Sequence, residues 1–391
     1  MSKIATLGLL IAVIIPTQSF RRSVPLPTMQ TPDVAQRYGG GRIVYNINLP
    51  YPTPGYAPEQ RIGIVDVDGS HAMTITANQN QFKTLHLDNA PHWSPNGKYI
   101  AFDATSYVTL SDANKQEILY IIDASTKKLL GSGVVMLNIS EFGPSIQWRP
   151  DSSALAYEAM DPKSYVYKIH IVNIDGTQDH IFLDNSPDVS ISRGSWSADG
   201  KHFLFFIQSP DNQPKSPGRH WIVSDPDGSN QHIVGGQDRV INWYPVGNAL
   251  SVSDAQGTVQ VVDLATGAVI KTVTYPHDYA YEYLPDQWSP DGRYLSFVPQ
   301  PDKNADTHID VLDSTDNHMS RLDTQPGDYH NDISWSPNSQ CLVVSATLDQ
   351  GDGTGLYILC VADKSTTTLI TGSQDVRRPD WWKPPLSQST G

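Results

Sequence analysis

Short apolar runs alternate with polar turns along most of the chain. Each run has five or six residues and is rich in β-branched or aromatic side chains, as in residues 99–104 and 202–207. A phrase made of a Trp and turn-forming residues precedes each of these runs, for example Trp-Ser-Pro-Asn-Gly at 93–97. A second apolar run follows after a variable loop, as in residues 119–123. Runs of this length and composition predict strands, and the Gly, Pro, Asn and Asp between them predict turns.

The Trp phrases recur at a nearly constant interval. Successive Trp residues of the phrase are 55, 48, 47, 45, 47 and 47 positions apart. The seven are Trp93, Trp148, Trp196, Trp243, Trp288, Trp335 and Trp382. Four short strands in each repeat of roughly 47 residues are typical of one blade of a propeller.

The two ends of the repeated region complement each other. Residues 41–76 resemble a blade that lacks its leading Trp phrase, and residues 378–384 resemble a Trp phrase that lacks its blade. Pairing the two fragments closes a ring and removes exposed sheet edges. We therefore predict an all-β, seven-bladed β-propeller with four-stranded antiparallel blades, in which the C-terminal strand completes the N-terminal blade.

The beginning of the chain carries a different signal. One Lys precedes an unbroken apolar run over residues 4–15, which is short for a membrane span of about 20 residues and typical of a signal peptide. We predict a signal peptide or an uncleaved signal anchor at 1–19, a linker at 20–39, the propeller at 40–384 and a C-terminal tail at 385–391. The protein is then exported: periplasmic, extracellular, or anchored with the propeller facing outside.

Composition favours a turn-rich protein over a helical one, and the net charge bears on the possible partners. Asp supplies 36 of the 41 acidic residues, and Gly and Pro together number 57, whereas Glu, a good helix former, is scarce. The formal net charge of −14 argues against binding along the phosphate backbone of nucleic acids, which requires clustered Lys and Arg. The sequence therefore indicates no nucleic acid partner, and contact with a membrane only through the N-terminal segment.

The Trp-Ser-Pro-Asp-Gly phrase, the apolar strand after it and the Asp-Gly-Ser or Asp-Gly-Thr turns resemble the TolB-type β-propeller repeat, a relative in architecture of WD-repeat propellers. The resemblance covers residues 40–384. It implies three settings: periplasmic interaction proteins, propeller domains of prolyl oligopeptidase-like peptidases, and oligogalacturonate-lyase-like enzymes. The Trp is expected to pack between adjacent blades, and Ser-Pro-Asp-Gly to form a turn.

No convergent set of residues indicates catalysis or metal binding. The Asp-x-Asp-Gly sequences at 66–69 and 225–228 lack the acidic twelfth ligand of a helix-flanked calcium loop. A Gly-x-Ser-x-Gly elbow and a His-Glu-x-x-His motif are both absent. The resemblance implies that a lyase would use a closely spaced His pair, and no two of the twelve His stand at His-x-His spacing. We expect no metal and no cofactor, with His92 and His330 the first histidines to inspect.

The two cysteines lie on neighbouring predicted strands. Cys341 and Cys360 flank a loop centred near residue 350, so a symmetrical hairpin places them directly opposite each other. Facing residues come within disulfide reach most readily when they form the closer, non-hydrogen-bonded kind of pair. A cross-strand disulfide in an exported protein and two buried free thiols are the alternatives.

Long variable loops are predicted to share one face of the disc with the entries to the inner strands. These loops are 48–60, 104–117, 208–219 and 299–307. Loops on a rigid scaffold concentrate binding. The residues predicted to bind there are Arg193, Arg239, Arg377, Arg378, Glu141, Asp286, Asp332, His330, Tyr51, Tyr56 and Tyr107.

The sequence therefore predicts an exported, non-catalytic propeller that binds a protein or peptide as a monomer. The alternatives are a carbohydrate-active enzyme resembling oligogalacturonate lyases and a peptidase-type propeller without its catalytic domain.

Overall fold

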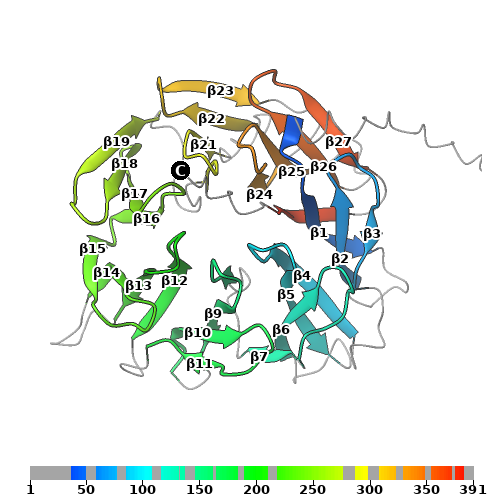
Figure 1. The fold of residues 1–391 in the computed structure, drawn as a ribbon, viewed down its shortest axis with the longest axis horizontal. Coiled ribbons are helices and arrows are strands. Elements are labelled where there is room, and N and C mark those ends of the chain that lie inside the picture. The colour runs from blue at the N-terminus through cyan, green and yellow to red at the C-terminus, as the bar shows by residue number, and fades with distance from the viewer. Residues whose placement is uncertain are drawn as a thin grey trace, which may run out of the picture.

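The computed structural model describes residues 37–49, 59–76, 85–107, 116–131, 133–136, 146–161, 164–183, 189–209, 218–275, 287–297, 308–322, 329–347, 354–371 and 375–382. Within these ranges the chain forms a ring of seven blades around a central opening (Figure 1). This confirms the predicted seven-bladed β-propeller. No helix in the described ranges is long and apolar enough to cross a membrane. The proposed leader at 1–19 and the tail at 385–391 lie outside the described residues.

Each blade consists of four strands that follow one another from the ring axis outward. Blade 1 contains β28 (Asp375–Trp381), β1 (Arg42–Leu49), β2 (Glu59–Asp66) and β3 (Met73–Thr74). Blade 2 contains β4 (Leu85–Trp93), β5 (Tyr99–Tyr107), β6 (Gln116–Asp123) and β7 (Val134–Met136). Blade 3 contains β8 (Gln147–Trp148), β9 (Ala154–Met160), β10 (Tyr167–Asn173) and β11 (His180–Ile181). Blade 4 contains β12 (Ser190–Trp196), β13 (Phe203–Gln208), β14 (Arg219–Ser224) and β15 (His232–Gly236).

The last three blades follow the same order. Blade 5 contains β16 (Arg239–Trp243), β17 (Ala249–Asp254), β18 (Thr258–Asp263) and β19 (Val269–Thr274). Blade 6 contains β20 (Gln287–Trp288), β21 (Tyr294–Phe297), β22 (Ile309–Asp313) and β23 (His318–Leu322). Blade 7 contains β24 (Tyr329–Trp335), β25 (Cys341–Thr347), β26 (Thr354–Cys360) and β27 (Thr366–Ile370).

The ring closes as predicted, because β28 pairs antiparallel with β1. The register corrects one assignment. In five of the other six blades the repeat Trp stands opposite the second residue of the next strand, as Trp93 stands opposite Ile100, and Trp381 stands in the same way opposite Ile43. The seventh repeat Trp is therefore Trp381 and not Trp382. Trp381 and Trp382 are adjacent, so the spacing of the repeat hardly separates them. The Lys-Pro that follows Trp382 resembles the start of a turn, and this led to the assignment of Trp382.

Trp382 takes the place that Ser occupies in most other blades. Its backbone N–H donates to the carbonyl of Arg42, as that of Ser94 donates to Tyr99. Its indole Nε1 donates to the carbonyl of Pro95 over 3.3 Å, and its ring lies 6.2 Å from that of Trp93. Trp382 therefore packs at the junction of blades 1 and 2.

The repeat Trp side chains lie between adjacent blades. The Nε1 of Trp148 donates to the carbonyl of His92, and that of Trp243 donates to the carbonyl of Ser195, in each case across to the preceding blade. The turn after the Trp is capped locally. Ser94 Oγ accepts from the N–H of Tyr99, a bond that recurs in other blades. These two junctions thus combine a partly buried aromatic ring with hydrogen-bonded backbone carbonyls.

The boundary of the proposed linker also changes. Tyr38 is fully buried and its ring lies 6.3 Å from that of Trp381. Arg37 forms an ion pair of 2.9 Å with Asp363, and its carbonyl accepts from Asn338. Arg37 and Tyr38 therefore belong to the propeller, because their side chains are part of its packing, and the linker predicted at 20–39 ends before them.

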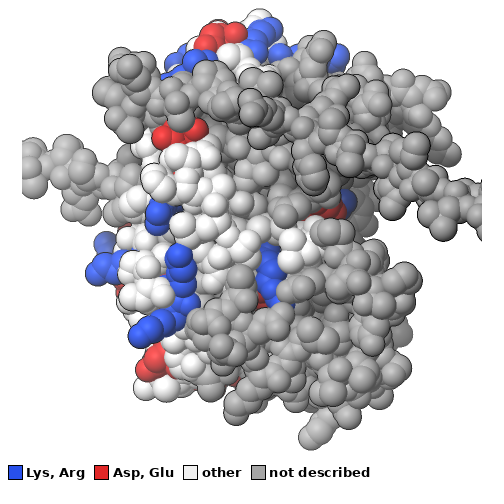
Figure 2. Space-filling view, turned by 90° about the vertical axis from the view of Figure 1, so that its right-hand side faces the viewer, with Lys and Arg blue, Asp and Glu red and all other residues white. Residues whose placement is uncertain are grey.

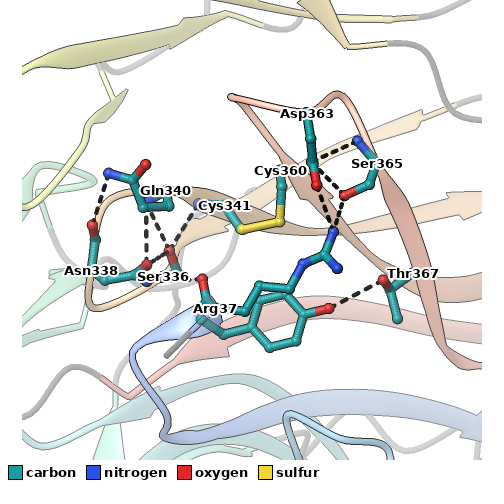
Figure 3. The surroundings of a disulfide bond; sticks show 10 residues. Arg37, Ser336, Asn338, Gln340, Cys341, Cys360, Asp363, Ser365 and Thr367 are labelled. Atoms are coloured by element: carbon teal, nitrogen blue, oxygen red, sulfur yellow. Dashed lines mark hydrogen bonds and ion pairs between the residues drawn. A yellow bond between two sulfur atoms is a disulfide. The ribbon is translucent and has the colours of Figure 1, made fainter. Parts of the chain in front are cut away.

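Cys341 and Cys360 stand directly opposite each other on β25 and β26, as the hairpin symmetry predicted. Their Cα atoms are 4.0 Å apart and their sulfur atoms are bonded (Figure 3). The pair is of the non-hydrogen-bonded kind. The N–H of Cys341 donates to Ser336 Oγ, and that of Cys360 donates to the carbonyl of Ser365. Both half-cystines are buried beside Tyr38.

Candidate functional site

The inner strands bend at one repeated place. Ala90, Arg193 and Arg378 each stand three residues before a repeat Trp and adopt positive φ, at 44°, 55° and 51°. The pairing register shifts at each of these places. A bulge of this kind re-aims a side chain and is common next to functional sites. Two of the arginines predicted to bind, Arg193 and Arg378, are thus held in bulges on the inner strands.

A buried carboxylate from the neighbouring blade holds the bulge of Arg193. Glu158 on β9 accepts a hydrogen bond from the backbone N–H of Arg193. Burial raises the pKa of Glu158, while the N–H groups of Arg193 and Gly194 act in the opposite direction. Glu158 was not among the predicted site residues. It stands ten residues after the repeat Trp148, and its side chain contacts Arg193 of the next blade.

The side chain of Arg193 and the backbone of Arg239, on adjacent blades, both contact Trp221. The guanidinium carbon of Arg193 lies 5.9 Å from the centroid of the Trp221 ring. The indole Nε1 of Trp221 donates to the backbone carbonyl of Arg239 over 2.9 Å. Phe206 packs on the other side, 5.2 Å from Trp221 between ring centroids. We call Arg193, Phe206, Trp221 and Arg239 the Arg–Trp patch.

The surface of the patch is partly open. Arg193 is exposed, Phe206 and Arg239 are half-buried, and Trp221 is buried beneath them. The guanidinium of Arg239 stands between two carboxylates, 3.6 Å from Asp238 and 3.5 Å from Asp254. Sequence reasoning found the two arginines but missed Phe206 and Trp221. Trp221 is one of two tryptophans outside the predicted repeat set. A Trp without a repeat role was the feature of the sequence that could have pointed to this site.

The closing strand carries the other two described arginines. Arg377 forms a 2.9 Å ion pair with Asp375. Burial opposes ionisation of Asp375, but hydrogen bonds from Arg377, Thr354 and Asn48 together bring its pKa below the usual value. This pair is at the start of β28, on the face where the inner strands begin.

Arg378 belongs to a more buried group of ionisable residues. Burial raises the pKa of Asp103 to about 7; Arg378 opposes this rise and Glu117 adds to it. Burial lowers the pKa of His92, Asp380 acts to raise it, and Arg378 acts to lower it further. Asp380 itself accepts from the backbone N–H of Trp93 over 2.8 Å. The group therefore ties the closing strand to blade 2.

The side chains of the other residues predicted to bind lie outside the described part of the structure. Tyr51, Tyr56, Glu141 and Asp286 lie outside the described residues. Tyr107, His330 and Asp332 lie on strands β5 and β24, but their side chains are outside the described part. Among the side chains that are described, no group of three or more His, Cys, Asp or Glu is arranged to hold a metal ion.

The charges seen from the side of blades 7, 1 and 2 are scattered. In Figure 2 the Lys and Arg side chains stand apart among uncharged residues over the described surface of that side. The Arg–Trp patch lies on the opposite side of the ring in Figure 1, where blades 4 and 5 meet, and there the Arg193 side chain and the Arg239 backbone contact one Trp.

Comparison with known proteins identifies no family model and no curated protein that matches the chain. Among solved structures, a prolyl endopeptidase is 14% identical over 90% of this chain and 53% of its own, with a TM-score of 0.60. An oligogalacturonate lyase in complex with manganese is 13% identical over 78% of this chain and 83% of its own, with a TM-score of 0.52. TolB from Acinetobacter baumannii is 18% identical over 89% of this chain and 67% of its own, with a TM-score of 0.49.

The chain spans about half the length of the prolyl endopeptidase that it matches. All three identities are below 25%, so the likeness concerns the fold alone. On its own topology and on these likenesses, the chain is a seven-bladed β-propeller protein.

Proposed function

We propose that this protein is an exported, non-catalytic β-propeller that binds a protein or peptide partner through its loop-rich face and channel mouth. The observation that carries the proposal is the Arg–Trp patch. Arg and Trp are the residue types most enriched among side chains that dominate the binding energy of interfaces. Here the guanidinium of Arg193 and the backbone carbonyl of Arg239, from different blades, contact one buried Trp, with a half-exposed Phe beside it.

The rigidity of the patch supports this role. The Arg193 backbone is fixed in its bulge by Glu158, and Trp221 is fixed by its bond to the Arg239 carbonyl. Side chains held in place before binding lose little conformational entropy when a partner docks. The Cys341–Cys360 disulfide supports export, because such bonds persist in oxidising compartments.

The test is to capture partners on immobilised protein from an envelope and secreted-protein extract. The double variant Arg193→Ala with Arg239→Ala is expected to reduce recovery of the specific partner by about tenfold or more, since interface arginines of this kind contribute 2 kcal/mol or more, roughly. Circular dichroism checks that the double variant keeps the fold.

A matched control comes from the opposite face of the disc. Arg149 and Arg293 also lie over aromatic rings, 5.4 Å from Trp196 and 4.8 Å from Tyr294, but they are in or next to the turns that follow the repeat Trp. Replacing both by Ala removes the same charge and is expected to leave capture unchanged. Equal loss in both double variants, or no loss in either, contradicts a partner site at the patch.

A further inference from the structure

The charge of Arg193 is balanced differently from that of most other arginines in the described ranges. Eight others form an ion pair with an Asp: Arg37, Arg42, Arg61, Arg149, Arg239, Arg293, Arg321 and Arg377. Among the residues that the structure describes, no carboxylate forms an ion pair with the guanidinium of Arg193, and no acceptor takes a hydrogen bond from it. The Arg193 side chain is nevertheless exposed. Its positive charge is therefore open to a group from outside the described part.

The contact with Trp221 positions this guanidinium without using its hydrogen-bond donors. The guanidinium carbon lies 5.9 Å from the centroid of the Trp221 ring, where the cation is attracted to the π face. The backbone of Arg193 is held in its bulge by Glu158, which fixes the point from which the side chain extends. The N–H donors of the guanidinium, arranged in a planar fork, thus remain available on a side chain that is already placed.

A carboxylate is the group that best matches this planar fork. The two oxygens of a carboxylate accept two parallel N–H bonds from one guanidinium, which a single acceptor does not. Glu158 does not take this place, because its side chain accepts from the backbone N–H of Arg193. Burial also raises the pKa of Glu158, which favours its neutral form and leaves the charge of Arg193 less balanced. Charge complementarity therefore favours an acidic group at Arg193.

The apolar part of the patch indicates which kind of molecule carries the carboxylate. Phe206 pairs with Ser192, the residue next to Arg193, and its half-buried ring is open beside the guanidinium. Trp221 is only 2% exposed, so it offers no open aromatic face on which a sugar ring could stack. A peptide provides a carboxylate and an aliphatic or aromatic side chain on neighbouring residues, as this arrangement requires.

We propose that the Arg–Trp patch binds an acidic peptide segment of the partner, in which an Asp or Glu carboxylate pairs with Arg193 and a neighbouring aliphatic or aromatic side chain packs on Phe206. This inference rests on the proposed function of the patch and adds the chemistry of the partner to it.

The probe is a fluorescein-labelled hexapeptide with blocked ends and Glu-Phe at its centre, titrated with the full chain and followed by fluorescence anisotropy. The same peptide with Gln-Phe has nearly the same shape and no charge, and it is expected to bind about tenfold more weakly or worse, because it loses a charge-assisted pair of hydrogen bonds. A Glu-Ser peptide is expected to bind several-fold more weakly, since it cannot bury an apolar side chain on Phe206. The formal net charge of −14 acts against the acidic peptides, so a preference for Glu over Gln must come from a local contact.

Variants of two arginines locate this contact. Arg193→Gln is expected to weaken the Glu-Phe peptide by about tenfold or more and to leave the Gln-Phe peptide unchanged. Arg193→Lys keeps the charge without the planar fork and is expected to lose affinity several-fold. Arg149→Gln is the matched control. Arg149 also lies over a Trp ring, 5.4 Å from Trp196, but it pairs with Asp151 at 3.3 Å, so its replacement is expected to leave peptide binding unchanged.

Equal affinity of the unaltered protein for the Glu-Phe and Gln-Phe peptides overturns the inference, and so does an equal loss in Arg193→Gln and Arg149→Gln. Displacement of the probe by inorganic phosphate or by trigalacturonate, at the concentration at which the unlabelled peptide displaces it, also overturns it, because the patch then takes anions or acidic sugars in general. If the two peptides bind alike while partner capture still falls in the Arg193 and Arg239 double variant, the acidic peptide is wrong and the binding role of the patch stands. Unchanged capture in that double variant contradicts the binding role itself.

Discussion

The junction between blades 7 and 1 and the junction between blades 4 and 5 come from the same repeat, but they are filled differently. At the first, Trp381, Tyr38 and the Cys341–Cys360 pair are all buried in one continuous cluster, and Ile370 packs against it. At the second, Val234 packs against a smaller cluster, and a cavity of about 460 Å³ lies beside it.

The difference shows how one repeat can serve two purposes. The closing junction joins segments at opposite ends of the sequence, so chain entropy acts against it and dense packing is needed to hold it. The junction of blades 4 and 5 joins consecutive blades through the short link from Gly236 to Arg239, and so it tolerates incomplete packing. A continuous buried cluster holds the ring closure, whereas the cavity between blades 4 and 5 lies across the ring from it (Figure 1).

The largest expected effect concerns the Trp that closes the ring. Trp381→Ala is expected to lower the free energy of unfolding by about 3–5 kcal/mol, because the side chain is 1% exposed and its removal leaves a cavity. Trp382→Ala, at a half-buried side chain, is expected to cost about 1–2 kcal/mol. Urea unfolding followed by far-UV circular dichroism measures both. A larger loss in Trp382→Ala would contradict the assignment of Trp381 as the seventh repeat Trp.

The disulfide comes next. Replacing Cys341 and Cys360 by Ser together is expected to cost about 3 kcal/mol, since the bond closes a loop with a sequence separation of 19. The same loss should appear when the unaltered protein is reduced before unfolding. Thiol counting in denaturant without reductant should find no free thiol in exported protein. Two free thiols there would show that the cross-strand bond does not form.

A pH dependence of the free energy of unfolding is expected on the closing side of the ring. Asp103 and Phe206 occupy the same repeat position, ten residues after a repeat Trp. Of the two, only Asp103 has a side chain that can ionise. Burial raises the pKa of Asp103 to about 7 in the folded protein from a usual 3.8, so the folded state binds its proton more tightly. Its stabilising contribution is therefore complete below pH 4, roughly, and is lost as the pH rises through about 7, with a slope of up to about 1.4 kcal/mol per pH unit.

Asp103→Asn should remove this decline and raise the free energy of unfolding at pH 8 relative to the unaltered protein. The measurement is a series of urea unfolding curves between pH 4 and 8. A control at Asp227, which is exposed and whose pKa is held low by its bonds with Ser229, should leave the decline in place. An unchanged slope in Asp103→Asn would show that another group titrates in this range.

Much of the fold could be read from the sequence because it depends on local signals. Trp phrases at regular intervals marked the ends of the inner strands, and the hairpin symmetry placed Cys341 opposite Cys360. The site was harder to predict. Arg193 and Arg239 were singled out as charges at strand entries, but their meeting at Trp221 depends on two blades packing side by side.

The corrections have the same origin. Trp381 and Trp382 are the same residue type and differ by one position in the spacing of the repeat. Only the pairing of Trp381 with Ile43 shows which of them is the seventh repeat Trp. Tyr38 follows a Pro-containing stretch with no strand pattern, yet it is buried because blade 7 and β28 surround it.

By itself, the sequence determined the seven repeats and the strand and turn pattern within them, because each blade is encoded by contacts between residues close in the chain. The closure of the ring followed from the incomplete repeats at the two ends of the repeated region. The tertiary structure alone decided which Trp seals the closure, that Asp103 is buried beside the closing strand, and that a cavity lies between blades 4 and 5. These properties depend on side chains from different blades, and the distance between such side chains is set only when the ring has formed.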